Sequence, residues 1–113
     1  MRAVVDDLLA LERLDAIVYP TSPRRPALIS APPEVPGGGP GSPANIANLT
    51  GFSDLVVTVG FTGDDLPVGL SFLGRAFSEG KLLALGYSFE QATRARRLPV
   101  HTPRLQGETI TAP

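Results

Sequence analysis

Apolar positions in the first part of the chain change from a helical to an extended pattern. Val4, Val5, Leu8, Leu9, Leu11 and Leu14 follow a spacing of three and four residues. This spacing predicts a short amphipathic helix over residues 3–14. The run Ala-Ile-Val-Tyr at 16–19 is apolar without alternation and is terminated by Pro20. Such a run predicts a strand buried on both faces of a sheet, and helix followed by buried strand is an α/β pattern.

Two further apolar runs predict a β-hairpin. Residues 55–59 are continuous and rich in β-branched side chains, and residues 68–73 form a second apolar run. Gly63, Asp64 and Asp65 lie between the two runs and have the composition of a turn. We therefore expect these strands to pair in antiparallel fashion.

Helical signals flank this hairpin on both sides. Ser42-Pro43 and Gly51 mark the start and stop of a short helix over residues 43–50. Ser78 is placed to cap a longer helix, whose apolar positions are Leu82, Leu83, Leu85, Tyr87 and Phe89. The pattern predicts that Tyr87 and Phe89 belong to the core. Arg94, Arg96 and Arg97 suit the last turn of this helix, where a solvated cationic end is a simpler interpretation than a phosphate or RNA site.

Proline and glycine set the boundaries of the folded unit. Residues 20–43 are rich in both and predict a long loop. Its Gly-Gly-Gly-Pro-Gly run at 37–41 lacks the Lys-Ser or Lys-Thr of a phosphate-binding loop, so a flexible loop is the better interpretation. Residues 1–99 are expected to form one unit, and residues 100–113 a proline-rich tail.

Composition narrows the class of protein without naming a function. The chain has 113 residues, 42% of them hydrophobic, and a formal charge of -1. One small core is possible at this length, and the balanced charge gives no field that would attract nucleic acid or a membrane. There is no cysteine, which excludes disulfides and thiolate sites. We expect a cytoplasmic protein with no cofactor, no nucleic-acid partner and no membrane contact.

Several motifs in sequence order resemble the C-terminal part of amidase-signature hydrolases. They are Pro-Thr-Ser-Pro at 20–23, Asn-x-x-Asn-Leu-Thr-Gly at 45–51, Leu-Pro-Val-Gly-Leu-Ser-Phe-Leu-Gly-Arg at 66–75, Phe-Ser-Glu at 77–79, and Phe-Glu-Gln-Ala-Thr-Arg-Ala-Arg-Arg at 89–97. The resemblance implies an α/β fold in which a buried strand and an antiparallel hairpin form part of a mixed sheet packed with helices. It also implies that intact relatives hydrolyse amide C–N bonds through a serine, a second serine in a cis peptide and a lysine.

The catalytic groups of that family have no counterpart in this sequence. Lys81 is the only lysine and lies in the predicted long helix, and no Gly-Ser-Ser-Gly run occurs. A serine nucleophile needs a base within hydrogen-bond reach. We therefore assign no catalytic residue and expect a segment of an amidase-type hydrolase that is inactive alone. The alternative is a non-catalytic binding or assembly subunit that completes an amidase or amidotransferase partner. Either a homo-oligomer or a second chain is expected to cover open sheet edges.

The sequence departs from the family pattern at the start of the first hairpin strand. Ser53 and Asp54 stand where Pro-Ala is usual, and Thr58 replaces a second proline. Since proline fixes backbone angles, the lead-in to this strand is expected to be reshaped. Asp54, at the edge of an apolar run, is expected to face solvent or cap a turn rather than be buried.

Thr21, Ser22 and Asn45 are the candidate substrate-binding residues. Thr21 and Ser22 directly follow the predicted strand, and ligands in α/β sheets gather beyond strand ends. Hydroxyl groups that only satisfy turn backbone remain the alternative.

Other polar residues give weaker signals for chemistry. A triad of His101, Asp64 and either Ser71 or Ser88 lacks a nucleophile motif, and a surface histidine is the simpler interpretation. The carboxylates Asp6, Asp7, Glu12 and Asp15 resemble a solvated helix face rather than a metal site. Glu79 is better explained by the helix dipole than by catalysis.

Overall fold

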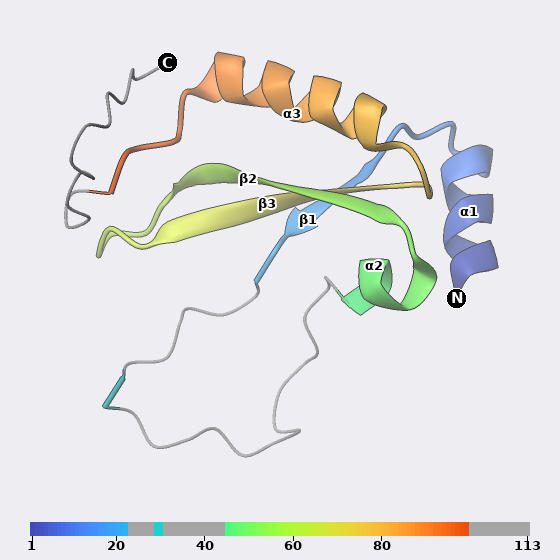
Figure 1. Ribbon diagram of the computed structural model, residues 1–113, viewed down its shortest axis with the longest axis horizontal. Coiled ribbons are helices and arrows are strands. Elements are labelled where there is room, and N and C mark those ends of the chain that lie inside the picture. Colours follow the sequence, from blue (N-terminus) through green and yellow to red (C-terminus); the bar gives the residue numbers. More distant parts are fainter. Residues whose placement is uncertain (23–28, 31–44, 100–113) are drawn as a thin grey trace, which may run out of the picture.

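A three-stranded antiparallel sheet forms the centre of the structure, which is a computed structural model describing residues 1–22, 29–30 and 45–99 (Figure 1). Its elements are α1 (Arg2–Leu11), β1 (Ile17–Pro20), α2 (Asn45–Thr50), β2 (Ser53–Phe61), β3 (Pro67–Gly74) and α3 (Glu79–Thr93). The α/β class expected from the sequence is confirmed. The predicted glycine run and the proline-rich tail lie outside the described residues.

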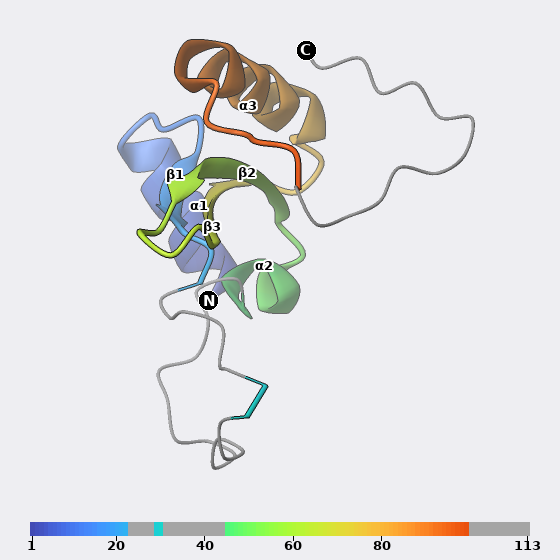
Figure 2. The ribbon, with the colours of Figure 1, turned by 90° about the vertical axis from the view of Figure 1, so that its left-hand side faces the viewer.

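Strands β2 and β3 form the predicted antiparallel hairpin, and β3 lies between β2 and β1. The tip is held by the Thr62 N–H donating to the Leu66 carbonyl at 2.9 Å. Register shifts between Thr58 and Gly60, so β2 carries a bulge near its end. A bulge interrupts strand pairing and increases the local twist, which agrees with the curvature of the sheet in Figure 2.

Two apolar clusters pack on opposite faces of the sheet. Figures 1 and 2 place α3 on one side and α2 on the other, with α1 at one end. Under α3 the buried residues are Val57, Phe72 and Leu82. On the other face they are Leu9, Ala47, Phe52 and Leu73. The central strand therefore buries apolar side chains on both faces, as the unalternating sequence of β3 indicates.

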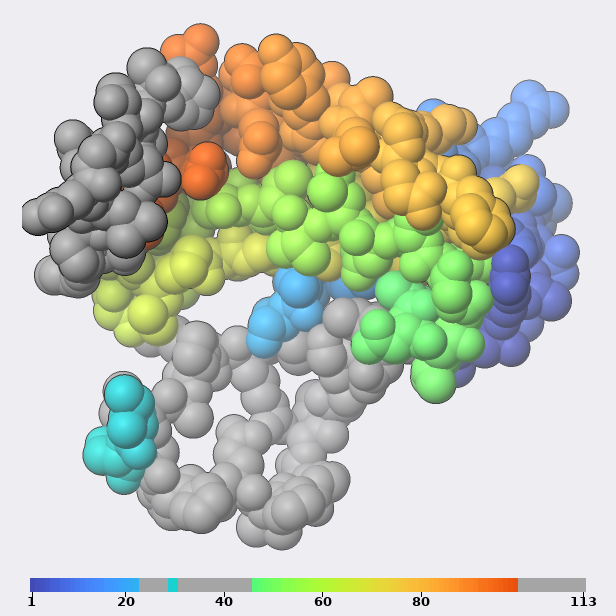
Figure 3. All heavy atoms as spheres, viewed as in Figure 1, coloured from blue at the N-terminus to red at the C-terminus, as the bar shows by residue number. Residues whose placement is uncertain are grey.

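Helix α3 approaches β2 closely because it has a glycine at the contact. A Cβ added at Gly86 would lie 2.5 Å from Leu55 Cδ2 and 3.4 Å from Val57 Cγ1. The rings of Phe72 and Phe89 meet edge to face, with centroids 5.8 Å apart. Side chains of α3 meet those of β2 in the space-filling view (Figure 3). The expectation that Phe89 belongs to the core is confirmed.

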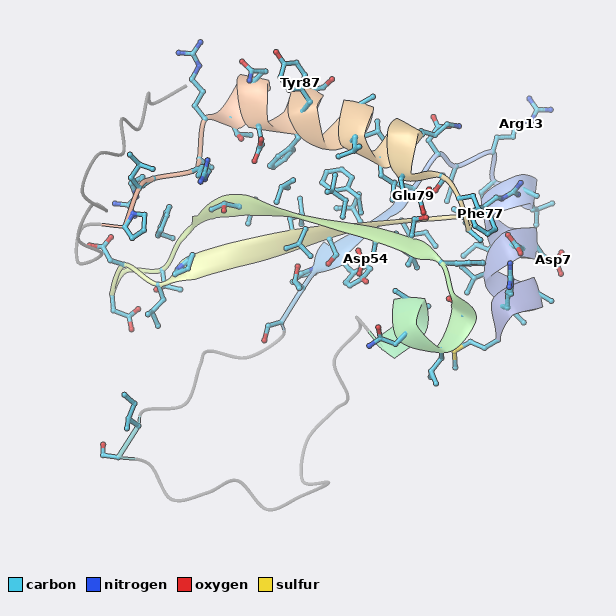
Figure 4. The ribbon with its side chains drawn as sticks, in the orientation of Figure 1. Asp7, Arg13, Asp54, Phe77, Glu79 and Tyr87 are labelled. Atoms are coloured by element: carbon cyan, nitrogen blue, oxygen red, sulfur yellow. The ribbon has the colours of Figure 1, made fainter. Side chains whose placement is uncertain are left out.

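The outer side of α3 corrects one prediction. Tyr87 is 66% exposed and points away from the sheet (Figure 4). Its place in the sequence satisfies helical spacing, but the stripe that faces the strands is centred on Leu82 and Gly86. The expectation that Tyr87 is a core residue is therefore wrong.

The end of α3 corrects a second prediction. Arg94 adopts a left-handed conformation, with φ at 45°, and its N–H donates to the Glu90 carbonyl at 2.8 Å. This left-handed residue ends the helix before the other two arginines, so they do not occupy its last turn. Arg97 instead lies over the Phe61 ring, 3.7 Å from the centroid, and pairs with Asp65 at 3.0 Å.

Two other sequence expectations differ from the structure in detail. Ser78 occupies the position before α3, but its hydroxyl donates to the Arg75 carbonyl at 2.7 Å and makes no cap bond to the helix. Strand β1 is at an edge of the described sheet, and Val18 is exposed rather than buried on both faces. None of the described helices is long and apolar enough to cross a membrane.

Candidate functional site

Polar side chains from all three strands gather on the sheet face opposite α3. Tyr19 on β1 is the cross-strand partner of Ser71 on β3, and Ser71 in turn pairs with Val56 on β2. Asp54 is two residues before Val56, so its side chain projects from the same face. The Tyr19 hydroxyl reaches over β3 and donates to Asp54 Oδ2 at 2.7 Å. We call Tyr19, Thr21, Asp54 and Ser71 the polar cluster.

The polar cluster is partly shielded from solvent. Burial is the largest cause that raises the pKa of Tyr19, and the hydrogen bond to Asp54 and its negative charge add to it, bringing that pKa to about 12. A hydrogen bond with Ser71 lowers the same pKa and offsets part of the rise. The phenol is therefore neutral and available as a donor throughout the physiological pH range.

Asp54 contradicts the expectation that it faces solvent. Its Oδ2 accepts from Tyr19, while its Oδ1 is buried and has no hydrogen-bond partner among the described residues. A buried acceptor without a donor costs free energy, on the order of 1–3 kcal/mol. The expectation failed because the register of the three strands, which no local pattern reveals, brings the Tyr19 hydroxyl to Asp54. An aspartate inside a strand is unusual, and that was the available signal.

Thr21 joins the polar cluster from the end of β1. Its N–H donates to the Gly69 carbonyl at 3.0 Å, and its hydroxyl lies 2.9 Å from the fully buried Ser71 hydroxyl, with which it shares a hydrogen bond. A Cβ at Gly69 would lie 3.0 Å from Thr21 Oγ1. Glycine at this position therefore lets Thr21 lie against the central strand.

The other two predicted binding residues are less well placed by the structure. Ser22 follows Thr21 and is exposed. Asn45 begins α2, but its side chain lies outside the described part of the chain. The structure thus brings the predicted Thr21 into the polar cluster, whereas the association of Tyr19, Asp54 and Ser71 depends on strand register and was not predicted. Substrate contact by Thr21, Ser22 and Asn45 stays a prediction.

The candidate catalytic residues of the sequence do not form a described triad. Ser71 bonds to Thr21, and the Ser88 hydroxyl donates to the Ala84 carbonyl at 2.9 Å. His101 lies outside the described residues. Lys81 Nζ is 2.7 Å from Asp15 Oδ1, in an exposed ion pair. Within residues 1–22, 29–30 and 45–99, no group of three His, Cys, Asp or Glu side chains is arranged to hold a metal ion.

Glu79 connects the start of α3 to the start of β2. The Ser53 hydroxyl donates to Glu79 Oε1 at 2.7 Å, and this bond is the largest cause that lowers the pKa of Glu79. The second cause is a bond to the backbone N–H at the helix start. Since Glu79 is exposed and its anion is stabilised, its chemistry suits anchoring of the helix rather than proton uptake.

The antiparallel sheet, the helices that cover it and the polar cluster on one face together form part of an α/β fold. The sequence model of the amidase family matches residues 2–83, about three-quarters of the chain. This chain belongs to the amidase family and matches its C-terminal part. The resemblance drawn from the motifs is confirmed.

Individual relatives agree with this assignment. The A subunit of glutamyl-tRNA(Gln) amidotransferase from Desulforudis audaxviator is 38% identical over 97 residues, which cover 83% of this chain and 20% of that protein. The native peptide amidase from Stenotrophomonas maltophilia is a solved structure with 36% identity and a TM-score of 0.61, over 85% of this chain and 20% of that one. A structure described as PAM12A has 41% identity and a TM-score of 0.62, over 82% and 18% of the two chains. The chain thus spans about one fifth of the length of these relatives.

Proposed function

We propose that this chain forms the C-terminal supporting part of an amidase-type hydrolase and does not hydrolyse amides by itself. The observation that carries the proposal is the ion pair of Lys81, the only lysine, with Asp15. Its ammonium group is exposed at the start of α3 and is held by a carboxylate. A serine nucleophile needs a base within hydrogen-bond reach, and the Lys81 ammonium group is hydrogen-bonded to Asp15 rather than to a serine.

Substrate contact through the end of β1 is the second part of this proposal. Thr21, Ser22 and Asn45 are the residues proposed to touch a carboxamide substrate held by a catalytic region outside this chain. Thr21 is supported by its position on the polar cluster, where Ser71 fixes its hydroxyl. A Thr21→Ser variant, which keeps the hydroxyl, should preserve the KM of a complemented enzyme, whereas Thr21→Ala should raise it.

The chain is proposed to act with a further polypeptide in the cytoplasm. Two strands lie at the edges of the described sheet, and exposed strand edges invite pairing with another chain. A second copy and a separate catalytic chain are both accommodated by this proposal. The lack of cysteine is compatible with a reducing compartment.

A second candidate is a non-catalytic subunit that completes an amidotransferase. It is favoured by the similarity to a protein named as the A subunit of glutamyl-tRNA(Gln) amidotransferase. The FEQATRARR sequence at the end of α3 does not separate this candidate from the first.

Ammonia release from a panel of simple carboxamides tests the proposal. The purified full chain should give no turnover above that of a heat-denatured sample. Turnover that is abolished by a serine-directed reagent would contradict the proposal. Adding the unmatched part of either the peptide amidase or the amidotransferase protein shows which partner the chain completes, because only the matching combination should gain activity.

A further inference from the structure

Helix α1 carries an apolar stripe that no described residue covers. Val4, Leu8 and Leu11 are 69%, 45% and 79% exposed. They are spaced by four and three residues, so they form one row along the helix. Another side of α1 holds the buried Leu9, and the Arg2 guanidinium lies over the Phe52 ring at 5.7 Å. The helix is therefore apolar on two sides, and only one is used within the described structure.

The borders of this α1 stripe are acidic. Asp7 lies beside Val4 and Leu11 on the helix surface, and Glu12 follows Leu8 by one turn, with its N–H donating to the Leu8 carbonyl at 3.0 Å. Both carboxylates are exposed, and neither forms an ion pair with a described residue. Figure 4 shows Asp7 pointing outward from α1.

The basic residues near α1, namely Arg2, Arg13 and Arg75, form no ion pair with these border carboxylates. Arg75 lies 3.6 Å from Asp6 and donates to the Asp6 carbonyl at 3.2 Å, which ties β3 to another side of the helix. Arg2 is held over Phe52 on the core side. An apolar row between carboxylates that pair with no described residue fits a partner whose own apolar row is bordered by lysine or arginine.

A second copy of this chain fits the stripe poorly. Two α1 helices packed through the same row would bring their acidic borders face to face, and like charges across an interface oppose association. The size of the relatives favours another occupant of the stripe. About four fifths of the length of each relative lies outside the part that matches this chain. A helical row is complementary to the side-chain ridges of another helix.

We infer that the α1 stripe is the docking surface for a helix of the catalytic part of an amidase-type protein, with an apolar face bordered by basic side chains. This inference rests on the proposed function, because it takes the partner to be the missing catalytic part. It adds which element of this chain makes the contact and which charges the partner carries there.

Binding to the peptide amidase from Stenotrophomonas maltophilia without its matched C-terminal region tests the inference. Leu11→Lys should weaken association with this fragment by about tenfold or more, as expected for a charge placed in an apolar contact. Asp7→Lys should weaken it less and should reduce its salt dependence. Leu83→Lys is the matched control, because Leu83 is an exposed leucine of α3, at 60%, and should leave binding unchanged.

A second measurement does not depend on the folding of that fragment. The full chain is titrated with two synthetic amphipathic helices that share one apolar face, bordered by lysine in one and by glutamate in the other. Saturable binding of the lysine-bordered peptide alone, lost in Leu11→Lys, supports the inference. Equal binding of the two peptides overturns the inference. Failure of the chain to bind any of the three partners, the two peptides and the amidase fragment, also overturns it.

The remaining outcomes are also decisive. Loss of binding in Leu83→Lys equal to that in Leu11→Lys overturns the assignment to α1. A dimer of the chain alone that Leu11→Lys dissociates makes a second copy the occupant and overturns it as well. Amide hydrolysis by the chain alone would contradict the proposed function, whereas these binding measurements need no hydrolysis and report on the docking surface separately.

Discussion

The two faces of the sheet hold the structure together by different means. Under α3 the contacts are apolar, with Phe72 against Phe89 and Leu82 fully buried beneath the helix. On the opposite face, apolar packing is confined to the region near α1 and α2, and the polar cluster continues beyond it. Apolar burial is non-directional, whereas hydrogen bonds depend on distance and direction. The hydrogen bonds of the polar face therefore form only in this register of the three strands.

The polar face also contains a buried hydrogen-bond acceptor that has no donor among the described residues. Asp54 Oδ1 is buried without a donor among the described residues, while the α3 side has no such atom within the part of the chain that the structure describes. Four changes test this contrast, from the largest expected effect to the smallest.

Removing the side chain of Leu82 should cause the greatest loss of stability. Leu82→Ala leaves a cavity between α3 and the sheet and should lower the free energy of unfolding by about 2–5 kcal/mol. Urea unfolding followed by circular dichroism measures the change. Leu83→Ala on the same helix is the control and should change it by less than about 0.5 kcal/mol, because Leu83 is exposed. Equal effects of the two changes would show that α3 is not packed as described.

Removing the Tyr19 hydroxyl alone should destabilise the chain more than removing both the hydroxyl and the Asp54 carboxylate. Tyr19→Phe leaves both Asp54 oxygens without a described donor and should cost about 1–3 kcal/mol. Adding Asp54→Ala to Tyr19→Phe should recover part of that loss, because no buried carboxylate remains. The same unfolding measurement completes the double-mutant cycle. Strictly additive losses would contradict the coupling of these two residues.

Alkaline pH should weaken the hydrogen bond between Tyr19 and Asp54 on the polar face. The pKa of Tyr19 is raised to about 12 in the folded chain, against 10.0 for the ordinary side chain. The folded state therefore retains a proton that the unfolded state loses, so stability is fully present below pH 10 and declines as the pH rises toward about 12. Urea midpoints at a series of pH values measure the decline. Tyr19→Phe should remove this component, and an unchanged decline in that variant would assign it to other groups.

The smallest effect is expected at the start of α3. Ser53→Ala removes the largest cause that lowers the pKa of Glu79, so this pKa should rise toward its ordinary value. The lowered pKa of Glu79 stabilises the folded state at pH values above the ordinary pKa of the group, and this stability is lost as the pH falls. Ser53→Ala should therefore make the free energy of unfolding slightly less sensitive to acid. A carboxyl NMR titration measures the change. No shift of the Glu79 resonance would show that the Ser53 bond does not form in solution.

The sequence predicted the hairpin and the family because both depend on local order. Gly63 to Asp65 lie between two apolar runs, and the β2 and β3 strands form on either side of them. The motif at 66–75 likewise comprises consecutive residues. Neighbouring positions carry this information directly, so no knowledge of long-range contacts was needed.

The polar cluster could not be predicted in the same way. Tyr19 and Asp54 are 35 residues apart, and their contact depends on β3 lying between β1 and β2. Helical spacing of apolar residues likewise does not mark the left-handed Arg94 that ends α3, or the contacts of Arg97 with Phe61 and Asp65 on the hairpin. Tyr87 was misplaced because helical spacing alone does not say which of two adjacent rows faces the sheet.

Amide hydrolysis with and without a catalytic fragment tests the central claim most directly. The purified chain and the peptide amidase fragment lacking the matched C-terminal region should each release no ammonia from simple carboxamides, and their mixture should release it. Ammonia release by the mixture is expected to be lost when Leu11→Lys weakens the contact between the chain and the amidase fragment. Hydrolysis by the chain alone, sensitive to a serine-directed reagent, would contradict the account.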